Sequence, residues 1–453
     1  MLQKRIIRHC LILVLFILPS FGFSGNVEES ADIWEIGVGK VKITPEFPMW
    51  MAGYASRTTP SEGVLHDLWA KAIVFQDQKG FKTLLITMDI LSIPQDFSNE
   101  LKGILKQRYD FEKSQIIISS SHTHSGPVVA RALKYIYPMD RSEWQKVDIY
   151  TAQLKKNLLL LVEQALSGLK PARIYTGNGI SRFQVNRRNN SENQLLSVTT
   201  LKGPNDYAVP VIKIEDLDKK LLAVIFGYAC HPTTLSINEF SGDYPGFAQI
   251  ELEKMYPGAM ALFFQGAGAD QNPLPRRSVP LAIQYGKQLA VSVECVLSGD
   301  MKIQKSNIQV AYDEVNLLFD TPLPMQKIQE ISLRDDYEGR WARGMIAEYE
   351  SNKSFRHNYP FPIQHWRIGE QQLFVLGGES VISYALQLKK LYGDEIFVMS
   401  YANDVMGYIP TVTILEEGGY EGDGAQRVYG LPARWDKSIE SRILAGFSEI
   451  LKM

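Results

Sequence analysis

The chain has little cysteine and almost no net charge. Three cysteines in 453 residues exclude a scaffold held together by disulfides. Lys and Arg number 48 against 50 Asp and Glu, so the formal net charge is -2 and no broad electrostatic attraction to nucleic acid is expected. Internal repeats, low-complexity tracts and Pro/Gly/Ser-rich linkers are missing as well, and no segment indicates an obligate protein partner. These absences favour one folded domain over a disordered or multi-domain chain.

Long apolar runs are also scarce, and the clearest one lies at the N-terminus. Residues 1–25 begin with a basic region, continue in an apolar run over residues 10–18 and end in small residues. The run is shorter than the roughly 20 residues of a membrane span, and the pattern is typical of a secretory signal peptide, with an uncleaved anchor as the alternative. We therefore predict a secreted or periplasmic protein. The mature chain keeps Cys230 and Cys295, which either pair or remain a buried pair of free thiols.

Strand-like and helix-like segments alternate along the rest of the chain. Short β-branched, apolar runs predict strands, and apolar residues at i, i+3 and i+4 predict helices. The predicted strands cover residues 71–76, 83–88, 115–119, 210–214, 221–227, 259–264, 373–376 and 395–399, and the clearest helices cover 97–109, 145–167, 247–255 and 281–298. This alternation predicts an α/β fold, with helices flanking a mixed β-sheet core in a single large domain over residues 26–453. Residues 317–360 are more polar and are expected to leave the core, and residues 436–451 predict a closing helix.

The sharpest motif places two histidines directly after a predicted strand. His122 and His124 lie in SSSHTHSGP (119–127), and positions i and i+2 of an extended segment project to the same side. Both can enter one pocket from the carboxyl end of a strand, where α/β proteins usually place their sites. Imidazole is the commonest protein ligand for metals such as zinc. A pair of hydrogen-bonding loop histidines would produce the same pattern.

Three further motifs also follow predicted strands. His231 ends an apolar run and precedes a proline, which suits a fixed ligand, although a satisfied core histidine is the alternative. Asp270 and Asn272 lie in the turn GAGADQNP (266–273), which is neither a dinucleotide fingerprint nor a P-loop and could be a plain tight turn. Glu379 in GGES (377–380) could be a ligand or a base, or it could cap the following helix.

Two histidine motifs, a strand-end glutamate and a Gly-rich Asp/Asn turn thus come from four separate strands. This set fits a catalytic zinc site with open coordination positions better than a structural zinc site. The chain has no CxxC pair, which also argues against a zinc finger.

In their order along the chain, the motifs resemble those of the neutral (non-lysosomal) ceramidases and their bacterial relatives, over about residues 36–425. The matching segments are IGVGKVKITP (36–45), GYASR (53–57), VLHDLWAKAIVF (64–75), SHTHSGP (121–127), GYACHPTTL (227–235), SGDYPGFA (241–248), GGES (377–380), ANDVMGYIPT (402–411) and GGYEG (418–422). Each could occur by chance, but so many in the right order are specific to the family.

The resemblance implies a single zinc ion held by two His, one Glu and one Tyr. Carried over by motif, the ligands are His122, His231, Glu379 and Tyr408, with Tyr401 and Tyr420 near enough in sequence to compete with Tyr408. His124 would lie beside the ligands or act as the acid/base histidine. A cation at Arg187, together with Tyr408, would stabilise an oxyanion. The residues implied in substrate binding are His66, Asp243, Asp270 and Asn272.

Two departures from the family pattern bear on the substrate. Asn272 stands at the family's serine position, and an amide can donate a hydrogen bond but cannot act as a nucleophile, which favours attack by zinc-bound water. The chain also ends at Met453, soon after the tyrosine segment, so we expect it to lack the immunoglobulin-like domain that follows in the ceramidases.

The leading expectation is therefore a secreted zinc-dependent amidohydrolase that cleaves the N-acyl amide of ceramide or a related N-acyl lipid, with the substrate met at a membrane surface. One alternative keeps the zinc site but makes the protein an esterase or deacylase acting on carbohydrate or another small acyl compound. Another is a non-catalytic lipid- or glycan-binding relative. A narrow apolar tunnel would favour a long acyl chain, and an open polar cleft would favour a sugar.

Overall fold

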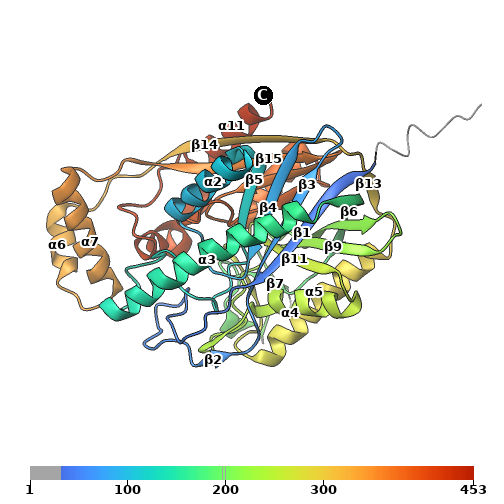
Figure 1. Cartoon of the computed structure of the whole chain (residues 1–453). Coiled ribbons are helices and arrows are strands. Elements are labelled where there is room, and N and C mark those ends of the chain that lie inside the picture. Colours follow the sequence, from blue (N-terminus) through green and yellow to red (C-terminus); the bar gives the residue numbers. More distant parts are fainter. Residues whose placement is uncertain (1–31, 196, 199, 453) are drawn as a thin grey trace, which may run out of the picture.

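The computed structural model describes residues 32–195, 197–198 and 200–452, and the leader predicted over residues 1–25 lies outside them. Its largest sheet has the strand order β11-β9-β8-β6-β1-β3-β4-β5, with β13 paired to β6 (Figure 1). The strands are β1 (Trp34–Lys42), β3 (Trp69–Gln76), β4 (Lys82–Met88), β5 (Ile116–Ser120), β6 (Lys170–Ile180), β8 (Ala208–Asp216), β9 (Leu221–Tyr228), β11 (Met260–Gln265) and β13 (Lys302–Gln304). The β4/β5 and β9/β11 pairs are parallel and the others are antiparallel, so the sheet is mixed.

A second sheet packs against one face of the first. Its order is β14 (Ile308–Leu318), β15 (Asn358–Ile368), β16 (Gln371–Leu376) and β18 (Phe397–Met399). Alternate side chains of both sheets are buried between them, including Trp34, Phe75, Trp366 and Phe397. The ring centroids of Phe75 and Trp366 lie 6.4 Å apart, edge to face, at this contact.

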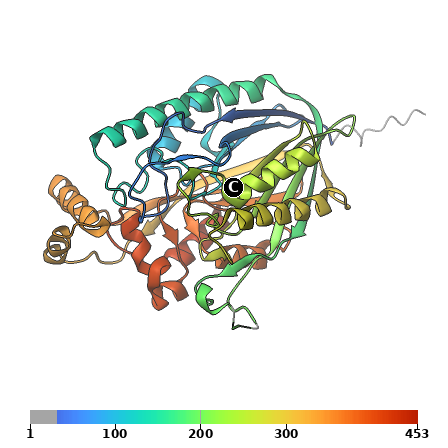
Figure 2. The ribbon, with the colours of Figure 1, turned by 90° about the horizontal axis from the view of Figure 1, so that it is seen from below.

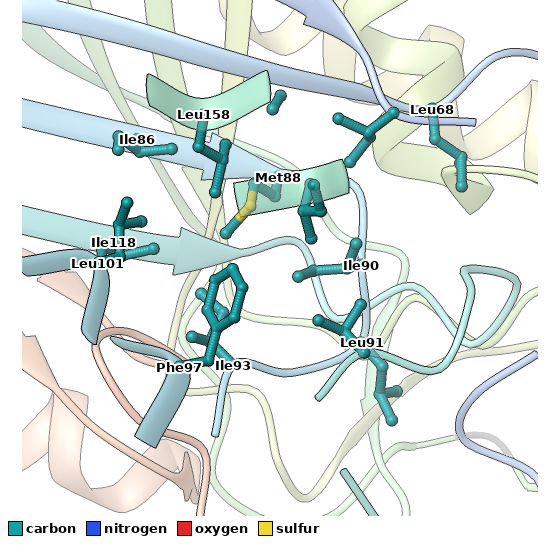
Figure 3. Close-up of a cluster of buried hydrophobic side chains, with 14 of the residues drawn as sticks. Leu68, Ile86, Met88, Ile90, Leu91, Ile93, Phe97, Leu101, Ile118 and Leu158 are labelled. Atoms are coloured by element: carbon teal, nitrogen blue, oxygen red, sulfur yellow. The ribbon is translucent and has the colours of Figure 1, made fainter. Parts of the chain in front are cut away.

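Helices cover the two outer faces. On the first sheet, α2 (Gln95–Tyr109) and α3 (Arg141–Ser167) pack over one half, and α4 (Asp243–Met255) and α5 (Val279–Leu297) over the other. The helices α8 (Ile382–Tyr392) and α11 (Ile439–Ile450) cover the second sheet. Helix, sheet, sheet and helix thus form four layers, which Figures 1 and 2 show from two directions. Figure 3 shows the apolar cluster under α2 and α3, in which Phe97 and Leu101 meet Ile86, Ile118 and Leu158.

The remaining elements are short or stand apart from these layers. The helices α6 (Met325–Ser332) and α7 (Tyr337–Asn352) form a hairpin at one end of the molecule (Figure 1). The short strands are β2 (Gly63–Val64), β7 (Gln184–Asn186), β10 (Glu239–Phe240), β12 (Gln271–Pro273), β17 (Glu379–Ser380) and β19 (Tyr408–Ile409), and the short helices are α9 (Val412–Glu417) and α10 (Ala425–Val428). In the described part of the chain, no helix combines the length and the apolar character that a membrane span requires.

The α/β prediction is confirmed, and each predicted strand and helix overlaps an observed one. The polar excursion over residues 317–360 contains the α6–α7 hairpin. The sequence did not reveal β1, β6, β14 and β15, because their glycines, prolines and outward polar residues break up the apolar pattern. Cys230 is buried and Cys295 exposed, and both are free, so the interpretation as a buried pair was wrong for Cys295.

The close approach of α3 to β1 gives a test of this packing. A Cβ atom on Gly37 would lie 1.8 Å from the carbonyl oxygen of Ala165 in α3. We expect Gly37→Ala to lower the free energy of unfolding by about 3 kcal/mol, because helix and strand must separate. Urea denaturation followed by far-UV circular dichroism measures the change.

The matched control is Gly103→Ala. Gly103 lies in α2, and a Cβ atom there would meet nothing within 4 Å. Alanine should raise helix stability at that position by about 0.5–1 kcal/mol. A Gly37→Ala protein as stable as wild type would contradict the close packing of α3 on β1.

Candidate metal centre

Three imidazoles meet where two strands of the first sheet end. His122 and His124 follow β5, and His231 follows β9. Each histidine offers one ring nitrogen, and these three atoms all lie within 4.8 Å of one another. The three side chains could therefore hold one metal ion, as the two histidine motifs predicted.

A two-residue parallel ladder brings a carboxylate and a phenol to the same place. Glu379 of β17 pairs directly with Tyr408 of β19. The Glu379 Oε2 atom lies 3.2 Å from His122 Nε2 and 3.0 Å from His231 Nε2. The Tyr408 hydroxyl lies 3.2 Å from the same His231 nitrogen. The four predicted ligands thus converge, and it is the Tyr408 hydroxyl that contacts the cluster, whereas the Tyr420 ring packs against that of Tyr408 with centroids 5.3 Å apart.

Main-chain carbonyls fix which nitrogen each ligand histidine presents. His122 Nδ1 lies 2.8 Å from the Leu91 carbonyl oxygen, and His231 Nδ1 lies 2.9 Å from that of Gly268. Because a carbonyl can only accept, each Nδ1 must carry a proton and donate it. With Nδ1 protonated, the neutral form of either ring presents a bare Nε2 lone pair to the cluster, the arrangement expected of a metal ligand.

The donor atoms fit a cation. Burial lowers the pKa of His231 to about 4, so its Nε2 is unprotonated at neutral pH. Glu379 Oε2 is buried and has no hydrogen-bond partner among the described residues. Electron-rich atoms at separations of 3.0–3.2 Å match the edge of roughly 3.3 Å between ligands in a tetrahedral site with bonds of about 2.0–2.1 Å.

Tyr429 fixes the other oxygen of the same carboxylate. Its hydroxyl donates a hydrogen bond to Glu379 Oε1, which leaves Oε2 turned toward the histidines. Sequence analysis missed Tyr429, because nothing in the surrounding RVYGLP segment distinguishes it from a core tyrosine. Tyr401 was considered only as a competing ligand, yet its ring centroid lies 4.5 Å from that of His122 and its buried hydroxyl has no partner among the described residues.

A two-stranded antiparallel ladder, β7 with β12, delivers Arg187. The Arg187 Nη2 atom donates to the Tyr408 hydroxyl at 3.1 Å, and its Nη1 donates to Asn272 Oδ1 at 3.4 Å. Burial opposes the charge, but Tyr408 and Glu421 raise the pKa of Arg187 above its ordinary value, so the guanidinium stays charged. The Arg187 guanidinium, the cation that the sequence predicted, therefore lies beside Tyr408, and Asn272 lies next to it.

The buried Asp270 holds this part of the site in place. Its carboxylate accepts hydrogen bonds from the Ile382 backbone N–H at 2.9 Å and from Asn186 Nδ2 at 3.0 Å. Its carbonyl accepts the Arg187 backbone N–H at 2.8 Å. Asp270 thus ties the turn after β11 to Arg187 and to the start of α8, and its predicted contact with substrate stays a prediction.

His124 lies beside the ligands and keeps one edge open to solvent. Its Nε2 is 3.3 Å from His122 Nε2. Burial and the neighbouring imidazoles lower the pKa of His124 well below its ordinary value. Gly53, at φ +103°, allows the close approach of the ring, since a Cβ atom there would lie 2.4 Å from His124 Nδ1. A neutral imidazole at this position can accept a proton and pass it on.

Arg57 is a second residue that sequence analysis left without a role. It is buried, and its guanidinium donates to the carbonyl oxygens of Ala52 and His124 at 2.9 Å and of Ile237 at 3.2 Å. It therefore joins the loop that carries His124 to two other loops.

His66 and Asp243, predicted to bind substrate, bond to the loop that follows His231. His66 Nε2 lies 2.9 Å from Ser241 Oγ, and Asp243 Oδ2 accepts the Leu235 backbone N–H at 2.9 Å. Within the part of the chain that the structure describes, none of their hydrogen bonds reaches the histidine cluster.

A cavity of about 430 Å³ adjoins the metal centre and shares Tyr429 as a wall. Apolar Leu133, Val405 and Met406 line it together with Arg131 and the buried Asp404. Tyr359 donates to Asp404 Oδ2 at 2.8 Å, while Oδ1 has no partner among the described residues. Burial raises the pKa of Asp404 to about 7.

Comparison with known proteins gives one consistent family. Residues 34–269 match the model of the N-terminal region of neutral/alkaline non-lysosomal ceramidase. Neutral ceramidase B of Dictyostelium discoideum is 25% identical over 55% of this chain and 37% of its own length. Neutral ceramidase of Mycobacterium tuberculosis is 26% identical over 52% of this chain and 39% of its own length. The matched part of the chain thus spans about two fifths of the length of these relatives.

Solved structures share the fold. A structure described as ceramidase complexed with C2 superposes with a TM-score of 0.71, at 17% identity, over 92% of this chain and 74% of that one. The neutral ceramidase from Pseudomonas aeruginosa gives a TM-score of 0.67 at 17% identity, over 88% and 72%.

The bond from Tyr429 to Glu379 predicts an effect on metal affinity. Tyr429→Phe removes the only donor to Glu379 Oε1 among the described residues, so the carboxylate loses its fixed orientation. We expect the dissociation constant for a divalent metal to rise about 10- to 100-fold. Tyr150→Phe is the control, because it removes a buried hydroxyl of α3 that bonds to the Ile43 carbonyl at 2.6 Å. Competition with a chromophoric chelator measures both, and equal affinities would argue against the positioning of Glu379 by Tyr429.

Asp404 predicts a pH dependence of stability. Its folded-state pKa of about 7 exceeds the value of about 3.9 expected in the unfolded chain, so the folded state binds the proton more tightly. Its contribution therefore favours folding at low pH and is lost as pH rises from about 4 through 7. Asp404→Asn should raise the Tm more at pH 8 than at pH 5, as measured by differential scanning calorimetry. An equal change at both pH values would show that Asp404 does not titrate in this range.

Proposed function

The chain belongs to the neutral/alkaline non-lysosomal ceramidase family, and from this membership we propose that it is a zinc-dependent amidohydrolase. Its substrate is ceramide or a related N-acyl lipid. Water adds its oxygen to the acyl carbon, the C–N bond breaks, and the nitrogen takes a proton, which yields a fatty acid and an amine. The leader predicted over residues 1–25 makes export to the periplasm or the medium part of this proposal.

The observation that carries the proposal is the convergence of four possible metal-ligand atoms on one point. His122 and His231 present bare Nε2 atoms to Glu379 Oε2, with the Tyr408 hydroxyl beside them. Two imidazoles, a carboxylate and a phenol form a nitrogen- and oxygen-rich set that suits zinc. Bound there, zinc would lower the pKa of water toward about 7 and polarise the carbonyl of the substrate.

The chain's own residues supply the rest of the chemistry. Arg187 and Tyr408 place hydrogen-bond donors side by side, where they can stabilise the negative charge that develops on the carbonyl oxygen. Asn272 Oδ1 already accepts from Arg187 and Thr233, so its amide N–H groups remain to orient the substrate. His124 is neutral at pH 7, because burial lowers its pKa, and its side chain is partly exposed, so it can take a proton and give it to the leaving nitrogen.

Hydrolysis of a fluorescent ceramide by the mature protein tests the proposal. We expect release of labelled fatty acid that a chelator abolishes and added zinc restores. His231→Ala and Glu379→Ala should lower both bound zinc and turnover by at least about 100-fold, since each removes a ligand. His357→Ala is the control, because His357 is exposed and outside the cluster. Bound metal is measured by mass spectrometry.

Two outcomes would reject separate parts of the proposal. Turnover that is insensitive to the chelator, or that survives in Glu379→Ala, would reject the metal assignment. Ceramide left intact by folded, zinc-loaded protein would reject ceramide as the substrate, and other N-acyl amides and acylated sugars would then be screened.

A further inference from the structure

Beyond His124, the metal centre is bounded by an aromatic ring and an arginine. The ring of Tyr54 lies 4.8 Å from that of His124, and the Arg277 guanidinium lies 5.2 Å from the Tyr54 ring centroid. Arg277 Nη1 donates to the Tyr54 hydroxyl at 3.0 Å, and that hydroxyl donates to the Leu235 carbonyl at 2.7 Å. Tyr54 is thus fixed between the acid/base histidine and Arg277.

Arg277 differs from the other arginines around the site in the partners of its guanidinium. Arg187 and Arg188 share the carboxylate of Glu421, and Arg276 pairs with Glu192 at 3.0 Å. The buried Arg57 donates hydrogen bonds to backbone carbonyl oxygens. Arg277 is exposed, and within the described residues it has no ion pair and uses a single side-chain donor.

The position of Arg277 is nonetheless fixed. Its backbone is left-handed, at φ +84°, and its N–H donates to the Thr234 carbonyl at 2.6 Å. The contact with the Tyr54 ring holds the guanidinium plane over the aromatic face. The Arg277 guanidinium is held in place but has no carboxylate partner among the described residues. It therefore has N–H groups left to donate hydrogen bonds to an anion.

The side of the site on which Arg277 lies indicates which part of the substrate it meets. In the proposed reaction Arg187 and Tyr408 face the carbonyl oxygen and His124 protonates the leaving amine, so Tyr54, which contacts His124, places Arg277 on the amine side. We propose that Arg277 binds an anionic group carried by the amine half of the substrate, so that the preferred substrates are N-acyl amides of amines bearing a carboxylate, sulfonate or phosphate. This inference rests on the proposed amide hydrolysis and favours, among ceramide and related N-acyl lipids, those whose amine half carries an anion over ceramide itself.

The test compares two soluble N-acyl amides with the same short acyl chain, one of taurine and one of ethanolamine. We expect kcat/KM to be higher for the taurine amide, and the preference to fall as salt rises. Arg277→Ala should reduce the taurine-to-ethanolamine ratio of kcat/KM by roughly five- to tenfold, and Arg277→Lys should keep part of it. Arg367→Ala is the matched control, because Arg367 is exposed on β15, has no ion pair within the described residues and should keep the wild-type ratio.

The outcomes separate this inference from the proposed function. Failure to hydrolyse ceramide and both soluble amides, with zinc loaded, would reject the hydrolase itself. Hydrolysis of the ethanolamine amide at least as fast as the taurine amide, or an unchanged ratio in Arg277→Ala, would overturn the anion site and leave the hydrolase standing. An effect of Arg277→Ala confined to substrate in vesicles of anionic phospholipid would assign the arginine to a membrane surface and would also overturn the inference.

Discussion

The site depends on two hydrogen bonds from imidazole to the main chain. His122 and His231 each donate from Nδ1 to a carbonyl oxygen, of Leu91 and Gly268 respectively. These bonds turn both Nε2 atoms toward Glu379 Oε2, which has no hydrogen-bond partner among the described residues. A buried carboxylate that faces two lone pairs is costly unless a positive charge compensates it. The tautomers thus explain why the cluster fits a cation, and they would be lost if either carbonyl moved.

Two residues of the site adopt strained backbone conformations, which persist only if the surrounding structure is rigid. His122 and Tyr401 adopt left-handed backbone conformations, at φ +63° and +56°. Such conformations cost about 1–3 kcal/mol each in residues other than glycine. The four packed layers supply that rigidity, and two short strand pairs position the site residues. The pairing of β17 with β19 places Glu379 beside Tyr408. The pairing of β7 with β12 places Arg187 beside Asn272.

The sequence predicted those parts of the fold and site that follow from local pattern. Strand ends are visible as apolar runs followed by polar residues, so the pattern marks His122, His231 and Glu379 as candidates, but the family resemblance was needed to select them as ligands. Tyr429 and Arg57 could not be found in this way, because their roles come from contacts with segments 50 residues or more away, such as Glu379 and His124. Motif resemblance assigned His66 and Asp243 to substrate, and this stays a prediction, since the hydrogen bonds of both residues run to the loop beyond His231. A motif indicates that a residue occupies a position of the family pattern. The contacts of that residue in the structure are needed to show what its side chain faces.

The donors and acceptors around the cluster are arranged asymmetrically, and this asymmetry gives the substrate a direction. The charged guanidinium of Arg187 and the hydroxyl of Tyr408 lie together on one side, where Asn272 and Glu421 hold the guanidinium. The neutral His124 lies on the other side, against Tyr54 and the loops that Arg57 joins. Negative charge develops on the carbonyl oxygen during hydrolysis, while the nitrogen needs a proton, so the two halves of an amide require opposite partners. An amide that placed its oxygen near His124 would lose the hydrogen bonds of Arg187 and Tyr408 and leave its nitrogen beside a cation. The same cluster that suits a metal ion therefore also orients the bond to be broken.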